Sequence, residues 1–271
     1  MNGLRNKKLG VIGVGQMGAL ILEGILEKRL VPRSQVWVYD KIDSKKEAIA
    51  RRLHVNRAAS AEALLKAAEV VLLAIKPQDL SEFASQSRAF LRSGQCVLSI
   101  MAGMTIAKLE AALGKKLSIV RAMPNLGAKA GQSMTVLCGQ DPQGISLAAQ
   151  LFKGCGEVVS LPEKSLDLVT ALSGSGPAYF FYVMELLERF GVRHGLPPQV
   201  SRLLAVQTGL GAARVAKGSN ISCADLRKMV TSKKGTTEAA LEIFKEGKLD
   251  FIFKRALTAA MKRSRALRGG A

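Results

Sequence analysis

The first part of the chain alternates short apolar runs with segments whose apolar residues recur every three or four positions. Runs of the first kind predict buried strands, and segments of the second kind predict amphipathic helices. The predicted strands are residues 8–13, 35–39, 70–75, 96–100, 117–121, 133–138 and 157–160, with a short extended piece at 54–55. The predicted helices are residues 16–28, 45–52, 61–68, 80–91, 106–113 and 144–152. This alternation is typical of an α/β fold, a doubly wound parallel sheet with helices on both faces.

The pattern changes after Pro162, and no convincing strand follows. Helical spacing predicts residues 166–190, 198–216, 224–230, 236–245 and 251–267 as helices. We therefore expect two domains, residues 1–162 with the sheet and residues 163–271 entirely helical.

The first helix of the second domain is interrupted by Ser173-Gly174-Ser175-Gly176-Pro177. Each glycine costs a helix roughly 1 kcal/mol and the proline roughly 3 kcal/mol. We expect a kink, a close helix crossing or free backbone N–H groups that face a ligand. The same stretch has no lysine between Ser165 and Ala216, although the chain carries a formal charge of +19.

The charge raises the question of nucleic-acid binding. The basic residues are spread along the chain, and no aromatic residue interleaves with a basic run as a base-stacking platform requires. We therefore expect a solvated surface that attracts anionic cofactors and substrates, and no nucleic-acid partner. No apolar run reaches the roughly 18–20 residues that span a bilayer, so we also expect no membrane segment.

Four scattered cysteines and two histidines offer too few ligands for a zinc site, so we expect no metal. Reduced thiols favour a cytoplasmic protein.

Gly13-Val14-Gly15-Gln16-Met17-Gly18 has the form G-x-G-x-x-G between an apolar strand and an apolar helix. In this context the string predicts a Rossmann-type dinucleotide site, with the first glycine at the tight turn and the second against the pyrophosphate. The free N–H groups of the following helix then face the phosphates. All six residues are candidate cofactor contacts.

Asp40 ends the second predicted strand, where a carboxylate accepts hydrogen bonds from the ribose of NADH and repels a 2′-phosphate. Lys41, Lys45 and Lys46 lie close enough to offset that repulsion. NAD(P)H is thus the expected cofactor, with a slight preference for NADH. Later strand ends add candidate cofactor contacts at Ala74, Lys76, Pro77, Ala102, Gly103 and Asn125.

Further motifs are more specific than the glycine fingerprint. The most specific are Ser-Gly-Ser-Gly-Pro-Ala-Tyr at residues 173–179 and Gly-Thr-Thr at residues 235–237. The others are residues 73–77, 99–103, 121–125, 169–172, 207–208, 211–213 and 230–232. With these motifs the chain resembles the pyrroline-5-carboxylate reductase family of proline biosynthesis over nearly its whole length.

The resemblance implies an oxidoreductase that transfers a hydride from NAD(P)H to the C=N carbon of 1-pyrroline-5-carboxylate, giving L-proline. It also implies that the helical domain forms a homodimer, that dimers often assemble into decamers, and that the substrate lies between the cofactor and residues 232–237. The substrate-binding residues that we expect are Ser175, Ser232, Gly235, Thr236 and Thr237.

The residues fit this chemistry independently. A protonated cyclic imine is already electrophilic, so positioning of donor and acceptor replaces a strong general acid. Gly235-Thr236-Thr237 at a helix start offers N–H groups to the substrate carboxylate. We assign Thr237 the catalytic role of hydrogen-bonding the substrate nitrogen region; a plain N-cap is the alternative for both threonines. Where the family usually has Ser-Pro-Gly-Gly, this chain has Ser232-Lys233-Lys234-Gly235.

Three other functions compete with this assignment. A β-hydroxyacid dehydrogenase needs a lysine on the long interdomain helix, and this chain has none there. A reductase of another cyclic imine stays open, because one methylene is worth only ~1–3 kcal/mol of discrimination. A non-catalytic, nucleic-acid-binding regulator on the same scaffold is favoured by the charge and opposed by the intact motifs.

Overall fold

The computed structural model describes residues 4, 6–114 and 116–269. It divides the chain into two compact units. The sheet unit comprises Met1–Ser175 with Ala260–Ala271, and the helical unit comprises Gly176–Ala259. The units therefore divide the chain later than the predicted boundary at residue 162, and the end of the last helix belongs to the sheet unit.

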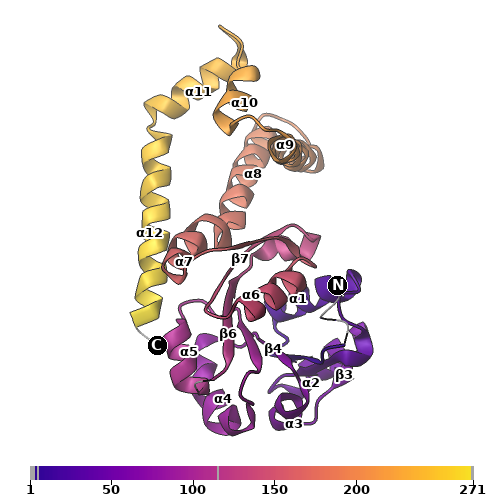
Figure 1. The fold of residues 1–271 in the computed structure, drawn as a ribbon. Helices are drawn as coiled ribbons and strands as arrows, with labels where there is room; N and C mark the ends of the chain where they lie inside the picture. The colour runs from indigo at the N-terminus through magenta and orange to yellow at the C-terminus, as the bar shows by residue number, and fades with distance from the viewer. Residues whose placement is uncertain (1–3, 5, 115, 270–271) are drawn as a thin grey trace. The chain divides into compact units, whose positions relative to one another are not determined.

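The sheet unit contains an eight-stranded sheet in the order β3-β2-β1-β4-β5-β6-β7-β8 (Figure 1). Its strands are β1 (Leu9–Ile12), β2 (Val36–Tyr39), β3 (Asn56–Arg57), β4 (Val70–Leu73), β5 (Cys96–Ser99), β6 (Ser118–Met123), β7 (Ser133–Gly139) and β8 (Gly156–Ser160). The predicted α/β class is confirmed. The short extended piece lies two residues later than expected, because His54 adopts a left-handed conformation that ends the preceding helix.

One strand pair departs from the expected parallel sheet. β6 and β7 pair antiparallel, with Val120 opposite Gly139, whereas every other pair in the described sheet is parallel. A parallel connection needs a crossover of about a dozen residues or more. Residues 124–132 hold only the short 3-10 helix η4 (Leu126–Ala130), so the chain turns back beside β6.

Helices cover both faces of the sheet. Leu22 and Ile25 of α1 (Gln16–Glu27), Ile49 of α2 (Asp43–Leu53) and Leu151 and Phe152 of α6 (Pro142–Phe152) belong to one buried core. The other core contains side chains of α3 (Ala61–Ala67), α4 (Leu80–Ser87), α5 (Ile106–Leu113) and α7 (Leu166–Val169). Val11 and Ile12 of β1 point into different cores, as alternation along a strand requires.

The interrupted helix continues through a π turn. α7 is followed by the π-helical segment Thr170–Gly174, in which the Ser175 N–H donates to the Thr170 carbonyl at 2.8 Å, and then by α8 (Gly176–Arg193). Pro177 has no N–H to bond the carbonyl of Ser173 four residues earlier. The Asn125 side-chain amide donates to that carbonyl instead, at 3.0 Å.

The end of α12 (Leu249–Gly269) is fixed within the sheet unit by a buried carboxylate. Asp167, 6% exposed, accepts hydrogen bonds from Ser264 Oγ at 2.8 Å and from Arg268 at 2.8 Å. A buried carboxylate needs such partners, since an unpaired charge in the interior is strongly disfavoured. The last helix therefore helps to complete the sheet unit, although it is far away in the sequence.

The helical unit contains α8, α9 (Pro198–Gly218), α10 (Cys223–Met229) and α11 (Thr236–Glu246), as well as the first half of α12. α8 and α9 pack closely where glycines make room: a Cβ on Gly209 would lie 2.7 Å from Met184 Cε. Large apolar side chains of this unit remain exposed, among them Phe180 at 68%, Phe190 at 64% and Met229 at 74%. Such exposure is typical of a surface that another protein covers.

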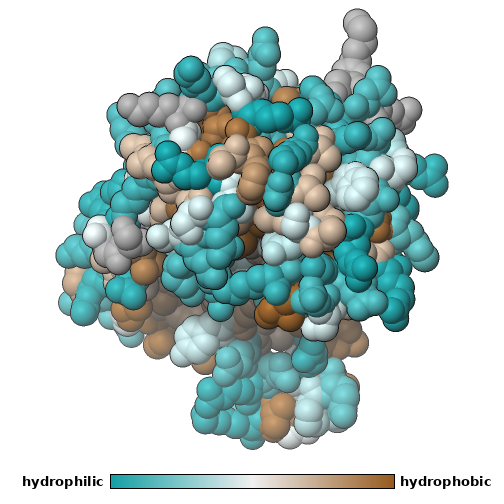
Figure 2. Space-filling model, turned by 90° about the horizontal axis from the view of Figure 1, so that it is seen from below, coloured by the Kyte–Doolittle hydropathy of each residue, from teal (hydrophilic) through white to brown (hydrophobic). Residues whose placement is uncertain are grey.

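The face of the molecule in Figure 2 is mainly hydrophilic, with hydrophobic residues in smaller groups. Within the described residues, no helix combines the length and the apolar character needed to cross a bilayer.

Candidate nucleotide and substrate sites

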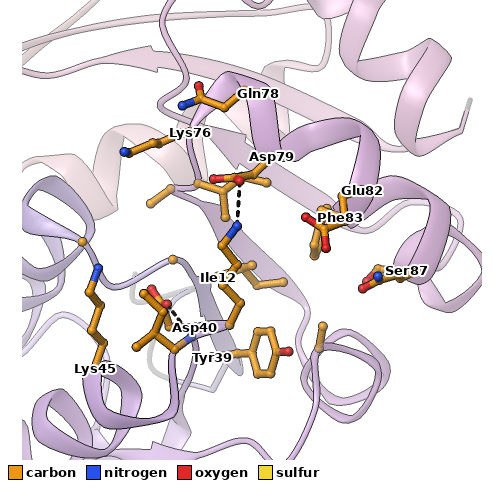
Figure 3. Close-up of a pocket in the computed structure, with 18 residues that line it drawn as sticks. Ile12, Tyr39, Asp40, Lys45, Lys76, Gln78, Asp79, Glu82, Phe83 and Ser87 are labelled. Atoms are coloured by element: carbon orange, nitrogen blue, oxygen red, sulfur yellow. Dashed lines mark hydrogen bonds and ion pairs between the residues drawn. The ribbon is translucent and has the colours of Figure 1, made fainter.

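A pocket of about 310 Å³ lies at the carboxyl ends of β1, β2 and β4 (Figure 3). Gly13, Gly15, Asp40, Ala74 and Lys76, all predicted cofactor residues, line it. The carboxyl ends of parallel strands are where such sheets bind ligands. The structure thus brings residues from three separate segments of the sequence into one pocket.

The three glycines of the fingerprint serve different purposes. Gly13 has φ +90°, and a Cβ there would lie 2.7 Å from the Ala74 carbonyl. A Cβ on Gly18 would lie 2.3 Å from the Gly13 carbonyl oxygen. Gly15 has ordinary extended geometry, and a Cβ there would meet no heavy atom within 4 Å beyond its chain neighbours. The fold therefore needs Gly13 and Gly18, whereas Gly15 leaves open space for a ligand.

The first turn of α1 is available to an anion. Gly15 is its N-cap and supplies no side-chain acceptor, so Gln16 and Met17 begin the helix with N–H groups that no side chain caps. The N–H of Val14 is engaged differently, because it donates to Asp40 Oδ2 at 3.0 Å. Of the predicted loop contacts, the helix start rather than Val14 offers free backbone donors to a pyrophosphate.

Asp40 is held by backbone at both carboxylate oxygens. Oδ2 accepts the Val14 N–H and Oδ1 accepts the Ile42 N–H, each at 3.0 Å. These bonds tie the glycine loop to the end of β2 and fix the carboxylate at the pocket wall, where Figure 3 shows it. Each oxygen retains a second lone pair for a ribose hydroxyl.

Charged side chains of both signs surround the pocket. Lys41 Nζ lies 2.8 Å from Asp79 Oδ1, and the hydrogen bond and charge of Asp79 raise the pKa of Lys41. In Figure 3 the amino groups of Lys45 and Lys76 lie on one side, and Glu82 and Phe83 lie on the other. Asp79, Glu82 and Phe83 were missed from the sequence, because helix-forming residues after Pro77 carry no ligand-binding pattern.

Pro77, Ala102, Gly103 and Asn125 do not line this pocket. Pro77 opens the 3-10 turn η2 (Pro77–Asp79). Gly103 has φ +75°, and a Cβ there would lie 3.1 Å from Leu267 backbone, so the loop after β5 packs against the end of α12. Asn125 supports the π turn through its Nδ2 and accepts the Gly127 N–H at Oδ1. Their roles as cofactor contacts stay predictions.

In the helical unit, the predicted substrate residues surround the start of α11. Gly235 is the N-cap, and a Cβ there would lie 2.3 Å from Ser232 Oγ, so the loop closes tightly over glycine. Thr236 and Thr237 are the first two helical residues, which makes a plain threonine N-cap wrong. Glu238 accepts the Lys234 N–H at 2.6 Å.

Ser175 lies in the sheet unit, half-buried at the end of the π turn. No group of three or more histidine, cysteine or acidic side chains in the described part of the chain could hold a metal ion.

The pocket fits a dinucleotide on three structural grounds. Gly15 leaves space beside the helix start, uncapped N–H groups suit the pyrophosphate, and the fixed Asp40 carboxylate suits a ribose. A bound nicotinamide would supply a hydride.

Comparisons with known proteins agree with this interpretation. Residues 163–267 match the family model described as pyrroline-5-carboxylate reductase dimerisation, and residues 8–103 match that of the NADP oxidoreductases that depend on coenzyme F420. Pyrroline-5-carboxylate reductase of Pseudomonas aeruginosa is 35% identical over 96% of both chains.

Two solved structures have the same fold over nearly their whole length. The pyrroline-5-carboxylate reductase of Coxiella burnetii aligns with a TM-score of 0.90 and 32% identity, over 97% of this chain and 99% of that one. The Plasmodium falciparum pyrroline carboxylate reductase with NADP bound aligns with a TM-score of 0.88 and 29% identity, over 98% of this chain and 100% of that one. By its sequence and its fold, this chain belongs to the pyrroline-5-carboxylate reductase family.

Proposed function

We propose that the protein reduces the C=N bond of 1-pyrroline-5-carboxylate with a hydride from NAD(P)H, giving L-proline in proline biosynthesis. One observation carries the proposal. The chain has both the predicted dinucleotide pocket and the Gly235-Thr236-Thr237 helix start, and it aligns with a pyrroline-5-carboxylate reductase over nearly the whole length of both. The hydride forms the new C–H bond, and the π electrons of the protonated C=N bond become the lone pair of the amine.

Thr237 is the proposed catalytic residue. Its hydroxyl hydrogen-bonds the substrate nitrogen region, while Ser232, Gly235 and Thr236 form the cradle for the carboxylate. The uncapped first turn of α11 supports this assignment, because its N–H groups and dipole favour an anion. Ser175 is proposed as a further substrate contact. Lys233 and Lys234, both exposed, add positive charge beside the cradle.

For the cofactor we propose a preference for NADH over NADPH. Its support is Asp40, whose carboxylate is fixed at the end of β2 by two backbone N–H groups. A carboxylate in that position binds the ribose hydroxyls and repels a 2′-phosphate. The free N–H groups of α1 serve both nucleotides equally.

We further propose a homodimer formed through the helical unit, with dimers assembling into decamers in the cytoplasm. The support is the exposed apolar surface of α8–α12 and the match of residues 163–267 to a dimerisation domain. The expected result of sedimentation is a mass at least twice the 28.9 kDa of one chain. A monomer at micromolar concentration would contradict the assembly.

The decisive test is NADH oxidation in the presence of pyrroline-5-carboxylate. We expect substrate-dependent loss of NADH absorbance and formation of proline, and faster turnover than with the six-membered homologue. Faster turnover of the homologue would favour the other cyclic-imine reductase. Absence of turnover together with salt-dependent DNA binding would favour the regulator.

A further inference from the structure

We propose that Asp79 makes the pocket selective for NADH by holding the Lys41 amino group away from the position of a 2′-phosphate. This inference rests on the proposed use of a nicotinamide dinucleotide, but it does not depend on the identity of the imine. Asp79 is thus assigned as a specificity-determining residue.

Lys41 is placed where a cation would recognise NADPH. It directly follows Asp40 at the end of β2, the position from which a basic residue reaches the 2′-phosphate in this kind of fold. Its amino group is 2.8 Å from Asp79 Oδ1, a contact drawn as a dashed line in Figure 3. Asp79 belongs to η2, which follows β4. The ion pair therefore links the end of β2 to the segment after β4, and both of its residues line the pocket.

The ion pair changes what the pocket offers to a phosphate. Lysine is a compact charge on a flexible stem, so its position depends on the anion that holds it. Asp79 draws the Lys41 amino group toward itself and offsets its charge, although two of the three N–H donors of Lys41 have no bond to Asp79. For a 2′-phosphate to be the main anion at Lys41, the amino group must turn away from Asp79. Asp79 would then lie near the phosphate as a like charge, which disfavours its binding.

Asp40 adds to the barrier because it has little freedom to move away. Both of its oxygens accept backbone N–H groups, which fixes the carboxylate beside the ribose position. Lys45 and Lys76 also line the pocket, and within residues 6–114 of the described structure neither of them forms an ion pair. Their charges are the same with or without Asp79, so they do not account for a difference that its removal makes. Asp79 is therefore the group whose removal would change the preference.

The experiment measures the dissociation constants of NADH and NADPH directly, through the fluorescence of Trp37, the single tryptophan of the chain. Trp37 lies on β2, two residues before the pocket residue Tyr39. We expect Asp79→Asn to raise the ratio of NADPH to NADH affinity about tenfold, as one new charge-assisted hydrogen bond allows. Adding Lys41→Ala to Asp79→Asn should abolish that gain.

Glu82→Gln is the matched control, because Glu82 lines the same pocket and its removal also deletes one negative charge without freeing Lys41. We expect it to change the ratio by less than about twofold, since a charge not in contact is screened by solvent. An equal gain in Asp79→Asn and Glu82→Gln would overturn the inference, and so would a gain that survives Lys41→Ala. If neither nucleotide binds the unaltered protein, the proposed cofactor use fails as well; if both bind and imine turnover is absent, only the proposed reaction fails.

Discussion

Replacing Gly15 by valine should abolish nucleotide binding and leave the folded protein as stable as before. Gly15 has an extended backbone that valine also adopts, and a Cβ there would meet no heavy atom within 4 Å beyond its chain neighbours. The added methyl groups would instead fill the space beside the start of α1 that a pyrophosphate needs. The expected measurements are an unchanged melting temperature and no quenching of Trp37 fluorescence by NADH.

Gly18→Ala supplies the contrast for this prediction. Its Cβ would lie 2.3 Å from the Gly13 carbonyl oxygen, so the loop must shift at a cost of about 1–3 kcal/mol of folding free energy. We expect a lower melting temperature for Gly18→Ala than for Gly15→Val. Normal NADH affinity in Gly15→Val would show that the dinucleotide does not use this loop.

Thr237→Ala should lower kcat/KM for pyrroline-5-carboxylate about ten- to hundredfold, the range expected for one hydrogen bond to a charged group. The melting temperature should stay nearly unchanged, because Gly235 rather than Thr237 is the N-cap of α11 and Thr237 is only partly buried. Stopped-flow or steady-state kinetics together with thermal unfolding test both parts.

The conservative variant Thr237→Ser keeps the hydroxyl and should retain most of the activity. NADH binding, followed through Trp37, should be the same in both variants, since Thr237 is assigned to the imine and not to the cofactor. Unaltered kinetics in Thr237→Ala would remove Thr237 from the mechanism and leave the cradle with a binding role only.

The interrupted helix illustrates how far a local pattern leads. The glycines and the proline predict a disturbance between residues 173 and 177, and the structure has a π-helical segment over Thr170–Gly174, which overlaps the start of that stretch. The sequence could not identify the partner of the unpaired Ser173 carbonyl. That partner is Asn125, 48 positions earlier, whose place after a strand predicts a cofactor contact instead.

In the pocket, too, some residues follow from local sequence patterns and others only from the tertiary structure. The glycine spacing and Asp40 predict a dinucleotide site from the sequence, because the turn, the helix start and the strand end each follow a local pattern, and the structure brings Gly13, Gly15 and Asp40 into one pocket. Asp79 carries no such pattern, and its pairing with Lys41 follows only from the order β2-β1-β4 in the sheet.

The sequence by itself determined the α/β class, the change to helices after Pro162, the nucleotide loop and the reductase family, because apolar periodicity and glycine geometry are local properties of the chain. The tertiary structure alone decided the antiparallel β6–β7 pair, the Lys41–Asp79 pair and the docking of α12 on Asp167. The last two join side chains 38 and 97 positions apart. Such contacts depend on which strands and helices become neighbours, and that is settled by burial of the whole core rather than by any segment of the sequence.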